Sequence, residues 1–391
     1  MTYRESLEKE IKAKINEIGF IELKEDVKIK DNIYLKKGID YPLKFSYIKS
    51  GLKDDTISKG IDLDKLIDSM LFLLGIDSPN LDKKIYEKLV KEILIKPADY
   101  IIEKTNQYFN KDYLDAIVYC RAYRKIFNED IRIKFIELQG IEYYIKSREK
   151  NFSHVEMDKI NAEITNNYLD LIQENKEFAL PYLSLAYIYE KRSHYIKAKL
   201  YLEKYINLSK DQASVQEARE ELIKIEDYVA VETAQTYIAY GENYKALDAL
   251  NKVSMDYEDE YLLYLLKGQV QYNLGEFKEA IKDLEKSCKK EITEDNATLL
   301  AMSYTQNGQI SPAKKVLEEA IRKINGSNIL YYDLGIINLK QNNLNKALDN
   351  FKNAYKLKAN NELLKLIEKL EKNIDNKWKR LYTKTAVAGQ I

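Results

Sequence analysis

Residues 273–287 read NLGEFKEAIKDLEKS, and two later stretches follow the same pattern around one alanine. These are QNGQISPAKKVLEEA at 306–320 and QNNLNKALDNFKNA at 341–354. Two earlier stretches, KRSHYIKAKLYLEKY at 191–205 and AYGENYKALDALNKV at 239–253, fit the same frame. A pattern that recurs at this interval, in a chain poor in glycine and proline, indicates an array of helical repeats.

Small and bulky residues recur at set distances from the central alanine of each stretch. A second small residue lies twelve positions before the alanine, and a bulky apolar residue lies four positions after it. Successive alanines are 48, 34, 33 and 34 residues apart. In chain order the alanines are Ala198, Ala246, Ala280, Ala313 and Ala347; the earlier small residues are Ala186, Ala234, Gly268, Ala301 and Gly335; the bulky residues are Leu202, Leu250, Leu284, Leu317 and Phe351.

This frame predicts a pair of antiparallel helices in each repeat. Small residues let two helix backbones approach each other, and we expect the bulky residues to fill the gap between repeats. A lone helix pair cannot bury its apolar face, so neighbouring repeats must stack. We therefore expect a mainly α fold, an α-solenoid of antiparallel helix pairs, with five repeats in residues 179–360.

The wide first interval exceeds the common period by 14 residues, which is about four turns of α-helix and would preserve the buried face. A lengthened helix is the first interpretation. No glycine or proline occurs between Lys210 and Tyr240. Residues 211–240 could therefore form one long helix, or two helices that separate near Glu226 and Asp227; the sequence leaves both open.

The pattern resembles the tetratricopeptide repeat family. The shared features are the 34-residue period, a small residue at the eighth position, a glycine in the turn between helices, an aromatic residue two positions on, and alanine at the twentieth position. Residues Leu274 to Ala280, LGEFKEA, carry the closest match. The family's proline near the end of each repeat is missing here, so we expect different turns between repeats. In this family, extended or helical peptides usually lie on the concave face.

Residues 1–96 predict a small α+β module of a different kind. Leu7, Ile11, Ile15 and Ile18 would share one face of a helix that ends at Gly19. Alternating apolar and charged residues from 20 to 35 predict a small antiparallel sheet with one wet face. Two helices follow, one carrying Leu63, Leu66, Ile67, Met70 and Leu71, the other Leu81, Ile85, Leu89 and Ile93.

Residues 97–178 predict two degenerate helical repeats. Tyr113 and Ala116 match the aromatic and alanine positions of the later repeats. A second pair is expected with Ile133, Ile136, Gly140 and Tyr143 on its first helix, and Ala162, Leu169 and Ile172 on its second, after a polar stretch at 149–154.

Residues 361–391 predict a capping helix and a flexible tail. Leu363, Leu364, Ile367 and Leu370 recur at helical spacing in an otherwise polar segment, as expected of a helix that closes the array. We expect a frayed tail from Thr383 onward, because the apolar periodicity stops there.

Composition disfavours several classes of partner and compartment. The chain has 63 basic and 63 acidic side chains, so no net charge attracts nucleic acid. The longest apolar run, Tyr261 to Leu266, is far shorter than the roughly 20 residues of a membrane-spanning helix. Cys120 and Cys288 show no metal or disulfide spacing. We expect a cytoplasmic protein without membrane insertion; the oligomeric state cannot be predicted.

The inventory of catalytic groups is small, so we expect no enzyme, no metal and no cofactor. His154 is expected in a polar loop and His194 in the turn between two helices, and both cysteines in helices as small buried hydrophobes. No G-x-G or P-loop pattern occurs. The acidic pairs Asp54-Asp55 and Asp62/Asp64 are expected to be solvated or to cap a helix.

The repeat frame and the family resemblance together predict the residues that line a concave groove. The expected lining is aromatic and amide-rich, which suits a protein or peptide partner with apolar anchors. A family subgroup grips a carboxylate with lysine and asparagine, but the matching positions here hold Leu183, Tyr187 and Glu232. We therefore expect an interaction adaptor or scaffold; the alternative is a regulatory receptor whose repeats change curvature when a peptide binds. The predicted lining is Tyr187, Glu190, Gln235, Gln269, Tyr272, Asn273, Met302, Thr305, Tyr332 and Ile336.

Overall fold

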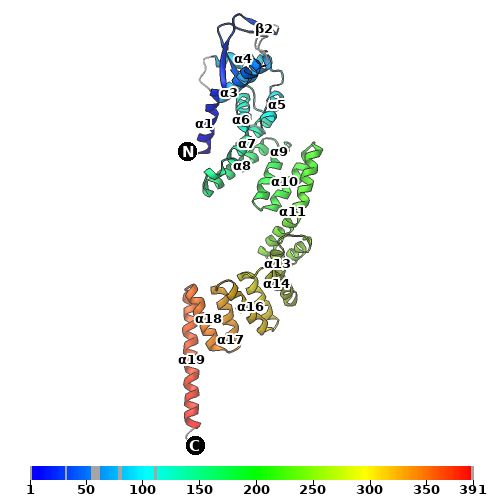
Figure 1. Cartoon of the computed structure of the whole chain (residues 1–391). Helices are drawn as coiled ribbons and strands as arrows, with labels where there is room; N and C mark the ends of the chain where they lie inside the picture. The colour runs from blue at the N-terminus through cyan, green and yellow to red at the C-terminus, as the bar shows by residue number, and fades with distance from the viewer. Residues whose placement is uncertain (1, 31–32, 54–61, 78–81, 110–111, 389–391) are drawn as a thin grey trace. The chain divides into compact units, whose positions relative to one another are not determined.

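The computed structural model describes residues 2–30, 33–53, 62–77, 82–109 and 112–388. Within these residues the chain is mainly α-helical, with short strands near its N-terminus (Figure 1). Asp54, Asp55 and Leu81 lie outside the described residues.

The chain divides into two compact units. Unit 1 comprises residues 1–192 with 200–218, and unit 2 comprises 193–199 with 219–391. The division passes through helices α10 (Tyr195–Leu208) and α11 (Gln212–Ala239). Helix α11 runs unbroken across the segment for which the sequence left one or two helices open, so the lengthened helix is confirmed.

Two small antiparallel sheets lie near the start of unit 1. Strand β1 (Ile18–Glu22) pairs with β4 (Asp40–Lys44), and β2 (Val27–Lys30) pairs with β3 (Ile33–Leu35). The alternating stretch therefore forms antiparallel strands, as the sequence predicted. Its first strand, however, pairs with β4, a segment that the alternation at 20–35 does not include.

The helix predicted through Ile18 is shorter than expected. Helix α1 (Tyr3–Ala13) begins with a capping box between Thr2 and Glu5, then gives way to the 3-10 turn η1 (Lys14–Glu17). Ile18 and Gly19 belong to β1, where pairing with β4 overrides the helical pattern. Gly19 suits the strand because a Cβ there would lie 2.9 Å from Cε1 of Phe45.

Helix α3 is the most buried element of unit 1. It contacts β4, α4 and α6, and all of its residues from Leu66 to Ile76 are buried. Asp62 caps its start by accepting a hydrogen bond from the Asp64 amide at 3.0 Å, as expected for that acidic pair. A Cβ on Gly75 would lie 2.0 Å from the Val118 carbonyl oxygen, so only glycine allows this close contact with α6. The bounds are α2 Phe45–Lys53, α3 Leu63–Ile76, α4 Lys83–Ile93, α5 Pro97–Phe109 and α6 Tyr113–Ile126.

Helices α5 to α8 form the two antiparallel pairs expected in the degenerate region. The first helices of the two pairs, α5 and α7, contact each other, and a Cβ on Gly140 would lie 2.7 Å from Cγ1 of Ile117. His154 is not in a loop but is the first residue of α8, because Ser153 and Glu156 form a capping box that starts the helix there. The bounds are α7 Ile131–Lys146, η3 Glu149–Asn151, α8 His154–Glu174 and α9 Leu180–Lys191.

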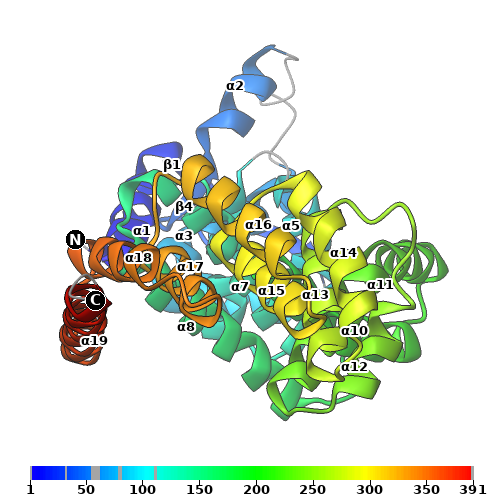
Figure 2. The same ribbon diagram turned by 90° about the horizontal axis from the view of Figure 1, so that it is seen from below.

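In unit 2, successive helices pack as antiparallel pairs, and the first helices of neighbouring repeats touch. Contacts join α13 to α15 and α15 to α17, which Figure 2 shows as neighbours. The central alanine and the bulky residue of every repeat are buried. The bounds are α12 Asn243–Leu250, α13 Glu260–Asn273, α14 Phe277–Lys290, α15 Glu294–Gln306, α16 Ile310–Lys323, α17 Asn328–Lys340 and α18 Leu344–Leu357.

Bulky residues fill the space inside a helix pair, where glycine admits them. A Cβ on Gly268 would lie 2.4 Å from Cγ of Leu284 in the same repeat. The expectation that such residues fill the gap between repeats is therefore wrong for this pair, because the glycine opposite Leu284 belongs to its own repeat.

Every repeat turns through a left-handed residue five positions before its alanine. Three repeats use glycine there, and the other two use a serine and an asparagine. After the left-handed residue, the next amide donates to a carbonyl near the end of the first helix, for example Glu276 N to Gln271 O at 2.9 Å. The five residues are Ser193, Gly241, Gly275, Gly308 and Asn342.

Helix α19 (Asn361–Ala388) follows the last pair and packs on α18. Leu363, Ile367 and Leu370 are buried, as the capping-helix pattern predicted. The frayed tail expected from Thr383 is wrong as far as Ala388, where the backbone is still helical. Neither glycine nor proline interrupts 383–388, so the helix propagates from its packed first half.

Candidate functional site

One face of α13, α15 and α17 carries exposed apolar side chains. Residues three before, one after and four after the small residue of a first helix share a helical face. On α17, Tyr332 lies three positions before Gly335. On α15, Met302 lies one position after Ala301, and on α13, Tyr272 lies four positions after Gly268. Met302 and Tyr332 are each 40% exposed, and Tyr272 is half-buried. Each of these large side chains therefore lies on the flank of its helix, beside the small residue.

These side chains line a groove of about 360 Å³. Its base is apolar and includes Ala301 and Ile337, both buried. The groove thus joins residues from three successive first helices. Its lining is Tyr272, Thr298, Ala301, Met302, Thr305, Gln306, Tyr332, Asp333, Ile336, Ile337 and Lys340.

Aromatic contacts hold the two tyrosines of the groove in place. The Tyr272 ring packs on Phe277 with 5.6 Å between centroids and 60° between planes. The Tyr332 ring packs on Phe351 at 5.6 Å and 51°. Each tyrosine therefore offers a pre-positioned apolar face and keeps a hydroxyl group that can bond a partner.

The polar groups of the groove are few. Thr298 donates a hydrogen bond to a carboxylate oxygen of Asp333 at 3.1 Å. Burial raises the pKa of Asp333, and the nearby Glu294 carboxylate raises this pKa further, while the Thr298 hydroxyl lowers it. The Thr305 hydroxyl donates to the Ala301 carbonyl at 2.7 Å, so it bonds its own helix. Asp333 is consequently the acidic group that faces an occupant.

A second cavity, of about 320 Å³, adjoins the groove between α17 and α19. Tyr332 lines both cavities, and Ile329, Leu363 and Leu366 add apolar surface to the second one. The apolar lining therefore continues from α13 through α17 to the start of α19.

The structure brings together half of the residues predicted for the groove. Asn273 Nδ2 donates to Asn243 Oδ1 at 3.2 Å, and Gln269 is half-buried on α13. Gln235 is exposed on α11, whereas Tyr187 and Glu190 lie on α9 in unit 1. The five that share the groove are Tyr272, Met302, Thr305, Tyr332 and Ile336.

The sequence prediction missed several lining residues. Thr298 occupies the same position relative to Ala301 as Tyr332 does relative to Gly335, so the repeat frame contained the signal for it. Asp333 and Ile337 lie two positions to either side of Gly335, between the positions that the frame marks. Only packing against the neighbouring helix brings them into the groove.

Glu232, one of the three residues at positions that match the carboxylate clamp of the family subgroup, has a structural role. The Glu232 carboxylate accepts a hydrogen bond from the Ile196 amide, 2.8 Å away, at the start of α10. An acidic side chain is favourable at a helix N-terminus, where backbone amides lack partners. A lysine at position 232 would lose this cap.

The cysteine thiols are poorly suited to nucleophilic catalysis. Cys120 is fully buried in α6, and burial raises its pKa well above the ordinary value. Burial also raises the pKa of Cys288, to about 12. Both cysteines lie in helices, as predicted, but the expectation that both are buried is wrong for Cys288, which is half-buried. His194 lies in the turn between α9 and α10, as predicted. A thiolate is the reactive form, so neither thiol is primed at neutral pH.

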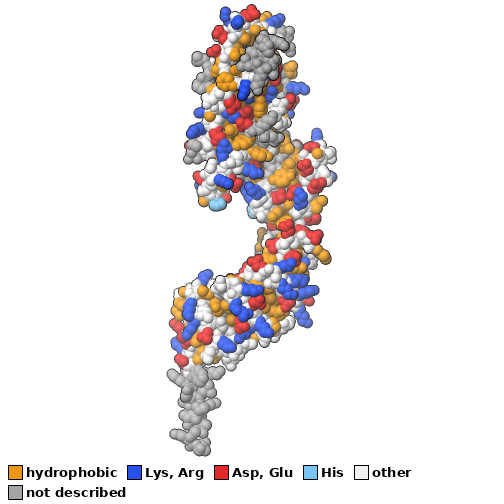
Figure 3. Space-filling view, viewed as in Figure 1, with side chains coloured by type: hydrophobic (Ala, Val, Ile, Leu, Met, Phe, Trp, Pro, Cys, Tyr) orange, Lys and Arg blue, Asp and Glu red, His pale blue; other side chains and the backbone are white. Residues whose placement is uncertain are grey.

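Neither the surface charge nor the helices of the described residues point to a specialised environment. On the face drawn in Figure 3, acidic and basic side chains are interspersed. Within the described parts of the chain, no helix combines the length and apolar character that crossing a bilayer requires. The same residues contain no group of three or more His, Cys, Asp or Glu side chains arranged to hold a metal ion.

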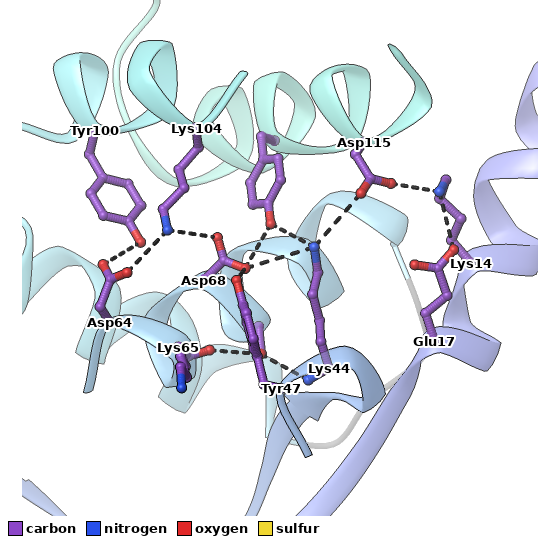
Figure 4. Close-up of polar contacts among 12 residues, drawn as sticks. Lys14, Glu17, Lys44, Tyr47, Asp64, Lys65, Asp68, Tyr100, Lys104 and Asp115 are labelled. Carbon is purple, nitrogen blue, oxygen red and sulfur yellow. Dashed lines mark hydrogen bonds and ion pairs between the residues drawn. The ribbon is translucent and has the colours of Figure 1, made fainter. Parts of the chain in front are cut away.

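A buried ionic cluster in unit 1 was not predicted from the sequence. Lys44 of β4 lies 3.8 Å from both Asp68 and Asp115 and donates to the Tyr119 hydroxyl at 2.8 Å (Figure 4). Its ammonium group also lies 3.7 Å from the centre of the Phe72 ring. The partners come from distant parts of the sequence, so no local spacing marks them. The cluster joins β4 to α3 and α6 and has a structural role.

Comparison with known family models matches one of the repeats. The tetratricopeptide repeat family model matches residues 261–289, which cover most of α13 and of α14. No curated protein matches the sequence. The match includes residues 273–287, with the central alanine Ala280.

Several solved structures share low-level similarity with the chain. YrrB, described as a TPR protein with an unusual peptide-binding site, is 18% identical over 52% of this chain and 97% of its own, with a TM-score of 0.37. The type IV pilus biogenesis factor PilW is 14% identical over 60% and 99%, with a TM-score of 0.36. The TPR2AB domain of yeast Sti1, in its pHSP90 complex, is 16% identical over 66% and 97%, with a TM-score of 0.24.

Proposed function

Because the chain is a tetratricopeptide-repeat protein, we propose that it is a non-enzymatic adaptor or scaffold that binds a segment of a partner protein. The proposed site is the groove of α13, α15 and α17. In the proposed organisation, residues 179–360 provide the repeats, with the module 1–96 and the degenerate repeats 97–178 before them and the cap 361–391 after them.

One observation carries the proposal: three successive first helices present apolar side chains to a single groove. Neighbouring packed helices lie about 8–10 Å apart, so anchors on three helices span roughly 16–20 Å. An extended peptide advances about 3.3 Å per residue, so five or six residues would bridge this distance. Tyr272, Met302 and Tyr332 would therefore receive side chains from one short segment.

The polar lining suits a peptide backbone. Asp333 can accept hydrogen bonds from peptide amides or from a basic side chain, and Gln306 can both donate and accept. Partially buried polar groups discriminate between partners, because an occupant that leaves them unpaired loses affinity. The non-enzymatic part of the proposal is supported by the lack of catalytic motifs in the sequence and by the raised thiol pKa values.

The proposal is tested by affinity capture from a native lysate with the full-length protein. The test variant is Tyr272→Ala/Tyr332→Ala. The matched control is Tyr240→Ala/Tyr244→Ala, which removes two tyrosines that are 78% and 76% exposed and lie outside the groove. Proteins recovered by the wild type and the control, but depleted in the test variant, are candidate partners.

The candidate segment is then synthesised, and its affinity is measured by fluorescence anisotropy. We expect the groove variant to weaken binding by at least about tenfold, which corresponds to about 1.4 kcal/mol. Circular dichroism should show equal helix content in all three proteins. Equal recovery and equal affinity in the groove variant would falsify the assignment of this groove.

A further inference from the structure

Unit 1 contains a separate cavity of about 420 Å³ between α7 and α9. It shares no residue with the groove of α13, α15 and α17, so it stands apart from the proposed function. Both of its walls are helices, and it opens on large exposed side chains. Tyr143 is 51% exposed, Tyr187 is 45% exposed and Leu180 is 41% exposed.

One end of this cavity is apolar. Phe135 is buried and packs edge-on against Phe178, with 5.6 Å between ring centroids. Leu180 and Leu183, from the first turn of α9, line the same cavity. Leu180 is exposed and Leu183 is half-buried beside the buried Phe135 ring, so apolar surface is left in water, which a ligand's apolar side chain would cover.

The other end is cationic. Lys146 is the last residue of α7 and Lys191 is the last residue of α9, and both line the cavity. Among the described residues, no carboxylate lies within ion-pair distance of either ammonium group. Lysine at a helix C-terminus is favourable in its own right, because it complements the helix dipole. This effect leaves the ammonium groups free to bind an anion.

The one acidic residue in the lining is engaged elsewhere. Glu142 lies one helical turn before Lys146, but its carboxylate accepts a hydrogen bond from the Tyr168 hydroxyl at 2.7 Å. Burial raises the pKa of Tyr168, and the Glu142 carboxylate that accepts this bond raises it further. The two lysines therefore outnumber the one carboxylate at this end of the cavity.

We propose that this cavity is a second peptide-binding site, which takes an acidic segment with one apolar anchor. The anchor would fill the Phe135 and Leu183 end, and an Asp or Glu side chain would pair with Lys146 and Lys191. Leu183 and Lys191 are eight residues apart on α9, which is about 12 Å along the helix axis. At about 3.3 Å per extended residue, the anchor and the acid lie about three or four residues apart.

The proposal is tested with fluorescein-labelled synthetic peptides and the full-length protein. The protein carries Tyr272→Ala/Tyr332→Ala throughout, so that the groove of unit 2 does not contribute. Each acidic peptide has one leucine or phenylalanine followed, after about two to six residues, by two glutamates. A matched set has lysines in place of the glutamates, and a third set has glycine in place of the anchor.

We expect the acidic set to bind, with the tightest binding at a separation of about three or four residues. The basic and anchor-free sets should bind about tenfold more weakly or worse. Lys146→Glu/Lys191→Glu should remove binding of the acidic set, and Leu180→Ser should weaken it. The control Lys150→Glu/Lys159→Glu makes the same change in net charge outside the cavity and should bind like the parent. Affinity should fall as salt is raised.

Two outcomes would overturn the proposal. In the first, no acidic peptide binds better than its basic counterpart at any separation. In the second, the reversal at Lys146 and Lys191 has the same effect as the control reversal, which would reduce the preference to net charge. Circular dichroism of the variants shows whether each one has folded.

Discussion

Gly335 lies directly against the ring of Phe351, so that a Cβ on the glycine would be 2.5 Å from Cε1 and 2.7 Å from Cδ1. The equivalent pair two repeats earlier is Gly268 with Leu284, where the Cβ would be 2.4 Å from Cγ. These two pairs show how the sequence frame specifies the distance between helices. Glycine stands opposite the bulkiest partner, Phe351, and a larger residue would force the helices apart.

Gly335→Ala should destabilise the protein more than Gly268→Ala. Other repeats already pair alanine with leucine, as Ala301 and Leu317 do in the frame, so the α13–α14 pair can relax to that arrangement. No repeat in the frame pairs alanine with phenylalanine, so the α17–α18 pair has no such arrangement to relax to. We expect Gly335→Ala to cost about 2–3 kcal/mol and Gly268→Ala about 1 kcal/mol. Hydrogen exchange of α17 and α18, compared with α13 and α14, measures both effects; an equal cost would contradict the steric account.

The turn between helices offers a stabilising change. Ser193 and Asn342 adopt φ values of 58° and 59°, in the left-handed region that three other repeats give to glycine. Ser193→Gly should stabilise the turn by up to about 1 kcal/mol, because a side chain in this region is strained. Asn342→Gly should gain less, since asparagine tolerates this conformation better than serine. Thermal unfolding measures the difference, and a lower melting temperature for Ser193→Gly would contradict the strain argument.

Removing Lys44 from the ionic cluster of Figure 4 should strongly lower the stability of unit 1. Lys44→Met leaves Asp68 and Asp115 buried without the ammonium group between them. Removing one partner of a buried ion pair typically costs 3–5 kcal/mol, and we expect about 3 kcal/mol because Lys104 and Lys14 still pair with the two carboxylates. Hydrogen exchange should report faster opening of α3 and α6. Lys44→Met/Asp68→Asn should recover part of the loss; if it opens even faster, charge burial is not the cause.

Asp77 makes the stability of unit 1 depend on pH in the acid range. Hydrogen bonds from Lys125 and Lys83, each at 2.8 Å, lower the pKa of Asp77 from 3.8 to about 2. A carboxyl whose pKa is lower in the folded state stabilises the fold above its ordinary pKa, and this stabilisation is lost as the pH falls from 3.8 toward 2. Because Asp77 is mostly exposed, we expect an effect below about 1 kcal/mol. The melting temperature of Lys83→Gln/Lys125→Gln should change less with pH in this window than that of the wild type.

Periodic positions were predictable from the sequence because the repeat itself imposes them. The frame located the buried alanines, the small residues and the bulky partners, and it placed Tyr272, Met302 and Tyr332 on one face. What it missed depends on contacts between distant segments. Ile18 follows the helical pattern of α1 but joins a strand, because β4 lies beside it. Lys44 looks like an exposed strand residue, yet it is 4% exposed, since two carboxylates and an aromatic ring from other helices surround it.

We expect the ionised Asp333 carboxylate to lower the stability of the fold at neutral pH and to strengthen the binding of a partner in the groove. Its pKa is raised by burial and by Glu294, so the folded state holds the proton more strongly than the unfolded chain. Stability therefore falls as the pH rises from 3.8 through the raised pKa, and the ionised carboxylate is a cost at neutral pH. Asp333→Asn removes this charge but keeps a group that accepts a bond from Thr298, so the melting temperature at pH 7 should be equal or higher. If a partner's amides or basic side chains pair with Asp333, the same variant should bind its segment about tenfold more weakly. A lower melting temperature with unchanged affinity would show that this carboxylate serves the fold and not the partner.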